Sequence, residues 1–353
     1  MTDKSEISIS GKHIGVGHPP FVTAELSGNH NQSLDRALEL VRAAADAGAD
    51  ALKIQTYTAD SMTLDVRREG FVIDDPKSLW NGKSLYELYR EASTPWEWHQ
   101  PIFELARKLG MIVFSTPFDG EAVEFLESFD TPCYKIASFE ITDLPLIRKT
   151  AATGKPLIIS TGMAKLDEIN DAVQAARETG NNDLILLKCT SSYPANPKAA
   201  NLRTIPDLRQ HFGCEVGLSD HTMGTSVAVA SVSMGATFIE KHFTLRRSDG
   251  GVDSAFSLEP EELKQLVHDT KMAWQALGTV AYGPADSEKD SLIFRRSLYF
   301  VEDIEQGEVI TSQNLRAIRP GYGLSPKYYE EILGKKAARF IEKGTPVSRE
   351  LVD

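Results

Sequence analysis

Residues 184–189 read LILLKC, residues 215–220 read EVGLSD and residues 238–243 read FIEKHF. Each stretch is a short β-prone run that turns polar at its end, which is typical of a buried strand that finishes in a loop. Five similar runs come earlier in the chain, so eight strands are predicted. They are Val22–Glu25, Ala51–Tyr57, Ile112–Pro117, Cys133–Ser138, Leu157–Thr161, Leu184–Cys189, Glu215–Asp220 and Phe238–Phe243.

Predicted helices separate several of these strands. One begins after Ser33, a residue that caps helices well, and ends before Gly48. Another spans 259–277 and carries Pro260 in its first turn. Alternating strands and helices predict a parallel sheet, and eight strands in about 260 residues predict a closed (β/α)8 barrel. A doubly wound open sheet is the competing architecture.

The character of the sequence changes after residue 282. We predict a barrel domain over 1–282, a linker over 283–290, and a small β-rich module over 291–353. The module contains the β-prone run Ser297–Val301 and a Gly-rich stretch around Arg319. It is too short to form a second enzyme core.

Composition excludes several classes of protein. The 353 residues carry 38 basic and 50 acidic side chains, a formal charge of −12, which disfavours a broad basic face for nucleic acid. The longest apolar runs, such as Leu184–Leu187, are far too short to span a bilayer. The N-terminus MTDKSEISIS lacks the apolar core of a signal peptide. Three scattered cysteines fit small core residues in a reducing cytoplasm, which is the predicted location.

Charged residues recur at the predicted strand ends, where a barrel carries its active site. Alternation places Lys53 and Gln55 on one inward side, and Glu240 and His242 on another. Each buried charge needs a partner, so any one of them could belong to a structural ion pair. The whole set, meeting at the same end of successive strands, predicts an active site.

Two histidines end neighbouring strands. His221 follows the seventh strand and His242 closes the eighth, with Glu240 nearby to bind metal-held water. Two imidazoles completed by oxygen ligands suit an exchangeable catalytic ion, Mn²⁺ first and Mg²⁺ or Co²⁺ as alternatives. The competing interpretation is a pair of hydrogen-bonded histidines that cap loops, and spacing alone does not separate the two.

Lys53 and Lys135 predict a site for phosphate or carboxylate. The hydroxyls expected around them come from Thr116, Ser138, Ser160 and Ser219. A buried lysine could instead be a Schiff-base nucleophile, as in barrel aldolases. A sugar-binding protein on an inactive barrel is a further alternative, although such a protein has no reason to keep charged residues at its strand ends. The aromatic stretch after the second strand, over 79–98, is predicted to cover the barrel rather than to stack on a sugar.

Several motifs together resemble the sialic acid synthase family over about residues 10–350. They are AELSGNHNQSLDRA from residue 24, KIQTYT, FSTPFD, YKIASFE, ISTGMA, LKCTSSYP, VGLSDHT, EKHF and RPGYG. The aromatic stretch LWNGKSLYELYREASTPWEWH, from residue 79, is more similar to the branch that forms pseudaminic acid than to the branch that forms N-acetylneuraminate.

The resemblance implies a (β/α)8 TIM barrel followed by a small antifreeze-like (SAF) domain. It implies a homodimer in which each SAF domain is exchanged over the partner's active site, bringing Arg319 to the sugar. The implied reaction condenses phosphoenolpyruvate with 2,4-diacetamido-2,4,6-trideoxy-β-L-altropyranose, and gives pseudaminic acid and phosphate by C–O cleavage. Acceptors that lead to N-acetylneuraminate or legionaminate are the alternatives within the family.

The resemblance also implies roles for individual residues. Glu25, Glu240, His221 and His242 would be catalytic, with the two histidines holding the metal. The residues implied to hold phosphoenolpyruvate are Lys53, Thr116, Lys135, Ser138, Ser160, Ser191 and Ser219. Those implied to hold the sugar, with Glu25, are Gln55, Glu140, Tyr193, Asp253 and Arg319. This sequence departs from the family at Ser191, where relatives can carry Asn, and over 244–251, which matches no family pattern.

Overall fold

The computed structural model describes residues 6–76 and 78–353, so the first half of the N-terminal stretch MTDKSEISIS lies outside the described residues. The chain divides into two compact units, one ending at Gly278 and the other running from Thr279 to Asp353.

The first unit is built on eight parallel strands that close into a barrel, in the order β10-β3-β4-β5-β6-β7-β8-β9. Closure is made by β10 against β3, where His242 lies opposite Glu25. The predicted barrel is therefore confirmed, and the open sheet is wrong. The strands are β3 Phe21–Glu25, β4 Ala51–Thr56, β5 Ile112–Pro117, β6 Tyr134–Ile136, β7 Leu157–Ser160, β8 Leu184–Cys189, β9 Glu215–Asp220 and β10 Phe238–His242.

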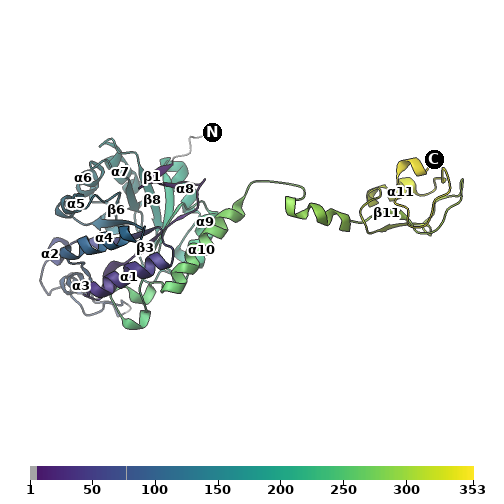
Figure 1. The fold of residues 1–353 in the computed structure, drawn as a ribbon. Coiled ribbons are helices and arrows are strands. Elements are labelled where there is room, and N and C mark those ends of the chain that lie inside the picture. The colour runs from purple at the N-terminus through teal and green to yellow at the C-terminus, as the bar shows by residue number, and fades with distance from the viewer. Residues whose placement is uncertain (1–5, 77) are drawn as a thin grey trace. The chain divides into compact units, whose positions relative to one another are not determined.

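Helices surround these strands (Figure 1). Polar N-cap residues start several of them: the Ser33 hydroxyl accepts from the amide of Arg36, and the Asp119 carboxylate accepts from that of Ala122. The helices of the ring are α1 Leu34–Asp46, α4 His99–Lys108, α5 Gly120–Glu127, α6 Leu144–Ala151, α7 Leu166–Arg177, α8 Thr204–Phe212, α9 Ser226–Ser233 and α10 Pro260–Leu277.

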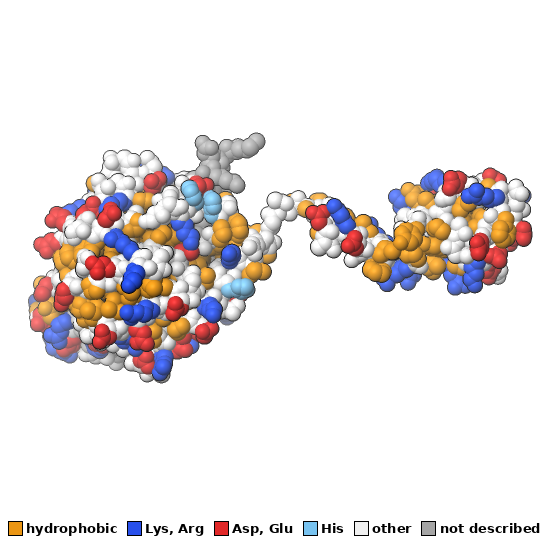
Figure 2. All heavy atoms as spheres, viewed as in Figure 1, with side chains coloured by type: hydrophobic (Ala, Val, Ile, Leu, Met, Phe, Trp, Pro, Cys, Tyr) orange, Lys and Arg blue, Asp and Glu red, His pale blue; other side chains and the backbone are white. Residues whose placement is uncertain are grey.

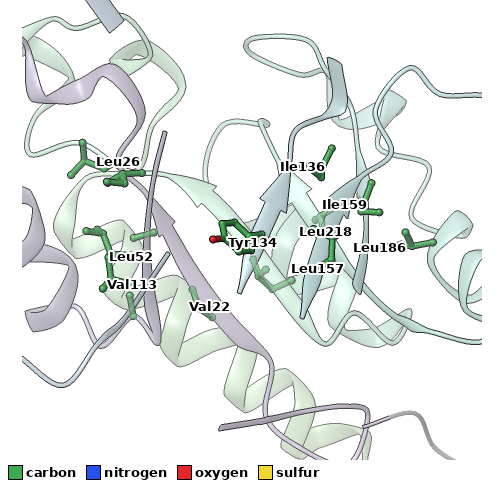
Figure 3. Close-up of a cluster of buried hydrophobic side chains, with 14 of the residues drawn as sticks. Val22, Leu26, Leu52, Val113, Tyr134, Ile136, Leu157, Ile159, Leu186 and Leu218 are labelled. Atoms are coloured by element: carbon green, nitrogen blue, oxygen red, sulfur yellow. The ribbon is translucent and has the colours of Figure 1, made fainter. Parts of the chain in front are cut away.

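The main core lies between the strands and this ring. Outward-facing strand residues such as Val22, Leu52 and Leu186 are fully or almost fully buried against apolar helix faces. Figure 3 shows these side chains spread around the barrel wall, from Leu26 and Leu52 across Tyr134 to Ile159 and Leu218. This layer leaves the inward-facing side chains free for a different use.

A second core fills the amino end of the barrel interior. Phe21 and Phe238 stack there with ring centroids 5.1 Å apart. A hairpin of β1 (Ile7–Ile9) and β2 (Lys12–Ile14) packs its isoleucines into the same cluster. Space inside is so limited that a Cβ at Gly217 would lie 2.1 Å from the Phe238 carbonyl oxygen.

A long insertion connects β4 to α4. It contains α2 (Ala59–Met62), a hairpin closed by the bridge between Val72 and Ser84, α3 (Leu85–Ala92) and a 3₁₀ turn at Trp96–Trp98. Ser84 and Glu87 form a capping box that fixes the start of α3. The aromatic stretch noted in the sequence therefore forms ordered structure.

The second unit has its own small core. Strands β11 (Ser297–Phe300) and β12 (Leu315–Ile318) pair antiparallel, and α11 (Tyr329–Ile332) packs nearby through Ile332. A 3₁₀ helix over Asp286–Phe294 precedes them. Arg319 follows β12 and is exposed.

Acidic and basic side chains are interspersed over the visible face of each unit (Figure 2). That distribution agrees with the absence of a broad basic face in the sequence. Within the described residues, no helix has the length and apolar content to cross a membrane.

Candidate active site

One cavity of about 280 Å³ opens at the carboxyl ends of the barrel strands. It brings together all but three of the residues that the sequence suggested for the site. The residues suggested by the sequence that line it are Glu25, Lys53, Gln55, Lys135, Ser138, Glu140, Ser160, Tyr193, Ser219, His221, Glu240, His242 and Asp253.

Two lysines and two glutamates form the floor of this cavity. Lys53 Nζ lies 3.0 Å from Glu25 Oε2 and 3.3 Å from Glu240 Oε1. Lys135 Nζ lies 3.7 Å from the same Glu240 oxygen. All four side chains are almost completely buried, so their charges interact with little screening by water.

The pKa values of the floor follow from this arrangement. Burial would lower the pKa of Lys53, but its two carboxylate neighbours outweigh burial and raise it. Burial lowers the pKa of Lys135. Burial also raises the pKa of Glu25, whereas the pKa of Glu240 is lowered despite burial because it faces both lysines. Lys53 and Glu240 are thus held as ions, and Glu25 is the carboxyl that takes a proton more readily.

The two histidines lie beside the floor with ring centroids 5.2 Å apart. His221 Nδ1 lies 3.0 Å from the Thr190 carbonyl oxygen, so its other ring nitrogen is the one free to bind a ligand. His242 Nδ1 is buried, has no hydrogen-bond partner among the described residues, and lies 3.9 Å from Asp253 Oδ2. Burial holds the pKa of His242 well below its usual range, so the imidazole is neutral.

This donor set can be tested against the metal implied by the sequence. Among residues 6–76 and 78–353, no group of three or more His, Cys, Asp or Glu side chains is arranged to hold a metal ion by itself. Two imidazoles, one of them neutral with an unpartnered nitrogen, fit an exchangeable ion whose other ligands are water or substrate oxygens.

A buried ion pair stands behind the histidines. Lys241 Nζ lies 2.6 Å from Asp220 Oδ2 and also donates to the Thr222 carbonyl oxygen. Lys241 and Asp220 alternate with the inward-facing residues of β10 and β9, so the pair lies outside the cavity. It ties together the two strand ends that carry His221 and His242.

The side chains expected to hold a sugar form a connected rim. Gln55 Nε2 donates to Glu25 Oε1 at 2.9 Å and to Ser27 Oγ at 3.3 Å, and Ser27 in turn donates to Asp253. Tyr193 packs against His221 with ring centroids 4.5 Å apart. Burial raises the pKa of Glu140 to about 7.

Three residues suggested by the sequence do not line the cavity. Thr116 is buried next to it and accepts a hydrogen bond from Lys53 Nζ at 3.2 Å. Ser191 Oγ lies 3.9 Å from Cys189 Sγ, one layer outside. Arg319 belongs to the second unit.

The cavity also contains residues that the sequence did not suggest. Cys189, expected to be a core residue, is buried but lines the cavity, with its Sγ 3.9 Å from His221 Nδ1. Alternation along β8 is the signal that could have found it. The insertion also contributes apolar side chains to the lining, an arrangement that the sequence does not distinguish from simple cover for the barrel. Trp80 from this stretch lines the cavity and donates from Nε1 to the Val252 carbonyl oxygen at 2.8 Å.

Comparison with known proteins agrees with this geometry. Residues 40–282 match the NeuB family model, and residues 295–352 match the SAF domain model. The chain belongs to the NeuB family. Among NeuB relatives, the pseudaminic acid synthase of Helicobacter pylori is 46% identical, over 95% of this chain and 98% of its own. The pseudaminic acid synthase of Campylobacter jejuni (serotype O:23/36) is 47% identical, over 92% of this chain and 94% of its own.

A solved structure in the same family has the same fold. The N-acetylneuraminic acid synthetase of Leptospira borgpetersenii superimposes with a TM-score of 0.73 at 32% identity. The superposition covers 82% of this chain and 95% of that one. The NeuB fold of a barrel followed by a SAF domain is thereby confirmed for this chain.

Proposed function

We propose that this chain condenses phosphoenolpyruvate with 2,4-diacetamido-2,4,6-trideoxy-β-L-altropyranose to form pseudaminic acid and phosphate. The observation that carries the proposal is the buried floor of the cavity, where Lys53 and Lys135 provide positive charge next to two carboxyl groups. Two relatives named pseudaminic acid synthase, at 46% and 47% identity, support the choice of sugar.

The proposed reaction forms one bond to each of two carbons of phosphoenolpyruvate. C3 attacks the aldehyde carbon of the open-chain sugar, and water adds at C2. The C2–O bond to phosphate then breaks, and phosphate leaves with its bridging oxygen. Lys53 and Lys135 offset the charge of the phosphate and carboxylate groups. The hydroxyls of Ser138, Ser160 and Ser219 offer hydrogen bonds at the same place.

Protons are handled by the carboxyl groups of the floor. The raised pKa of Glu25 suits a group that takes the proton from the attacking water, and Gln55 orients its carboxylate. His221 and His242 would hold a divalent ion, Mn²⁺ before Mg²⁺ or Co²⁺. Such an ion, when bound, supplies Lewis-acid polarisation of the aldehyde oxygen. Glu240, between the lysines, favours the charged form of each of them.

The assembly is part of the proposal. We place the protein in the cytoplasm as a homodimer that exchanges its SAF domains, with Arg319 of one subunit completing the sugar site of the other. Its support is that Arg319 is exposed and that its side chain forms no hydrogen bond or ion pair within residues 279–353, which leaves the guanidinium available for an anion or an acyl oxygen.

The test is phosphate release from phosphoenolpyruvate and Mn²⁺ with a panel of acylamino sugars. We expect release with the diacetamido-trideoxy acceptor, its loss in EDTA, and its recovery on adding Mn²⁺. Release with N-acetylmannosamine alone would overturn the choice of sugar and keep the reaction class. If no sugar in the panel supports phosphate release, the proposed reaction class is wrong. Full activity after exhaustive chelation would contradict the proposed metal dependence.

One observation favours a second candidate function. Burial lowers the pKa of Lys135, and a lysine of that kind can form a Schiff base with a keto acid. An aldolase of this type would be trapped on Lys135 by borohydride in the presence of pyruvate. We expect no such adduct, because Glu240 lies 3.7 Å from Lys135 Nζ and favours its charged form.

A further inference from the structure

The cavity has two halves of opposite chemistry. Its floor consists of charged and hydroxyl side chains from the strand ends. The insertion contributes the other half, and none of the side chains that its described residues place in the lining carries a charge. We call this half the apolar wall, and its members from the insertion are Tyr57, Met62, Ile73, Trp80, Leu85, Leu88, Tyr89 and Ala92. Tyr57 and Tyr89 add phenolic hydroxyls at its edge.

Helix α3 shows that this separation is built into the sequence. Leu85, Leu88, Tyr89 and Ala92 recur at the spacing of one helix face, and all four line the cavity. The charged residues of the same helix face another way. All three of them, Glu87, Arg90 and Glu91, line a separate depression with Gln32 and Lys83. The helix therefore presents only its apolar face to the cavity.

The apolar wall is held in place by hydrogen bonds outside it. The hairpin that carries Ile73 is closed by bonds from Ile73 N to Lys83 O at 2.9 Å and from Gly82 N to Ile73 O at 2.8 Å. The end of α3 is tied to the first barrel loop, because Gln32 Nε2 donates to the carbonyl oxygens of Glu91 and Ser93. Trp80 is bonded to the loop after β10 through Val252. The wall is thus formed before any ligand arrives.

A preformed apolar wall discriminates between hydroxyl and methyl groups. A sugar hydroxyl that enters the wall beside Met62, Ile73, Leu85 or Leu88 loses its hydrogen bonds to water, and none of these four side chains carries a nitrogen or oxygen atom to replace them. A methyl group in the same place is removed from water at a gain. We propose that the apolar wall, and α3 in particular, sets the acceptor preference of this enzyme for sugars that carry a methyl group where common hexosamines carry a hydroxymethyl group. This inference rests on the proposed function.

The test uses two acceptors that differ in one hydroxyl. They are N-acetylmannosamine and its 6-deoxy analogue, assayed with phosphoenolpyruvate by phosphate release. We expect kcat/KM of the wild-type enzyme to favour the 6-deoxy sugar by between about tenfold and about a hundredfold, the range over which apolar pockets discriminate single groups. An equal kcat/KM for the two sugars, or a preference for the hydroxyl, would overturn the proposal.

Variants assign the preference to the wall. Leu85→Asn places a polar amide on the α3 face, and we expect it to reduce the wild-type preference at least about fivefold while the KM for phosphoenolpyruvate stays unchanged. The matched control is Leu79→Asn, since Leu79 precedes Trp80 in the same insertion, is 49% exposed and does not line the cavity. Ile73→Asn tests the hairpin side of the wall and replaces Leu85→Asn if that variant does not fold.

The outcomes separate the two proposals. Phosphate release with both sugars at equal efficiency would contradict the wall and leave the reaction intact. A wild-type preference that survives in both Leu85→Asn and Ile73→Asn would show that other residues set it. Absence of phosphate release with every sugar would contradict the proposed function itself.

Discussion

The two ends of the barrel interior are made by the same strands and have opposite characters. On β10, Phe238 faces the apolar cluster at the amino end, and Glu240 and His242 face the cavity at the carboxyl end. On β5, Phe114 belongs to the apolar cluster, and Thr116, two positions later, binds Lys53. Two positions along the same strand thus separate close apolar packing from buried polar and charged groups. Folding free energy and chemistry are therefore supplied by different layers of the same strands.

The largest expected effect comes from opening the apolar end. Phe114 is completely buried there, so Phe114→Ala should lower the free energy of unfolding of the barrel by about 3–5 kcal/mol through lost burial and a cavity. Urea unfolding followed by tryptophan fluorescence measures this effect, because all four tryptophans lie in the first unit. The kcat of the folded variant should remain. A large loss of kcat with unchanged stability would contradict the division between the two ends.

A smaller effect on the free energy of unfolding is expected when the pH is lowered. It should arise from His99, in the packing behind the polar end. His99 is buried among Phe103, Phe125 and Phe129, and its Nε2 lies 2.7 Å from Thr56 Oγ1. Burial lowers the pKa of His99 to about 4. Between that value and the unfolded value near 6.5, the unfolded chain binds the proton that the folded chain refuses, so stability falls as pH falls.

For this histidine, the loss between pH 7.5 and pH 5 should be on the order of 2 kcal/mol. His99→Phe keeps a ring in the aromatic cluster and leaves Thr56 its bond to Ser115 at 2.6 Å. We expect the pH dependence of the urea midpoint to be correspondingly weaker in this variant. His268→Gln, at an exposed position on α10, measures the effect of removing a surface histidine. Equal pH dependence in His99→Phe and the wild type would contradict the assignment.

The smallest expected effect has opposite signs for stability and activity. Ser160 Oγ is buried at the polar end with no hydrogen-bond partner among the described residues. Ser160→Ala should therefore stabilise the barrel by up to about 1 kcal/mol, since an unsatisfied hydroxyl is removed. The same change should raise the KM for phosphoenolpyruvate about tenfold, the value of one hydrogen bond to a charged group. A destabilised variant with an unchanged KM would place Ser160 in the core instead.

Much of this arrangement could be predicted from the sequence. The period of two along each strand identifies the inward-facing residues, so Lys53, Gln55, Glu240 and His242 could be assigned to one cavity without coordinates. Observed and predicted strand bounds differ most at β6, which is shorter than Cys133–Ser138 because its ends turn into loops.

Other parts could not be predicted, for physical reasons. The separation of Lys53 from Glu240 depends on how the barrel closes, which no single strand encodes. The hairpin of β1 and β2 has strands of three residues, too short to show a period. The apolar wall could not be predicted, because apolar residues on α3 look alike whether they face a core or a cavity. Only the hairpin around Ile73 and the bond from Trp80 to Val252 place them at the mouth.

The hairpin of β1 and β2 also affects how substrates enter the barrel and how products leave it. Because Ile7, Ile9 and Ile14 pack into the amino end, the barrel is a well with one opening rather than a tunnel. Substrates and products must therefore pass the insertion at the open end, and the ligand bound deeper in the barrel lies beneath the other. We therefore expect the ligand held by Lys53 and Lys135 to enter first and its phosphate to leave last, so phosphate should inhibit competitively with phosphoenolpyruvate. Binding and release would then be ordered, and the closed end of the barrel would set that order.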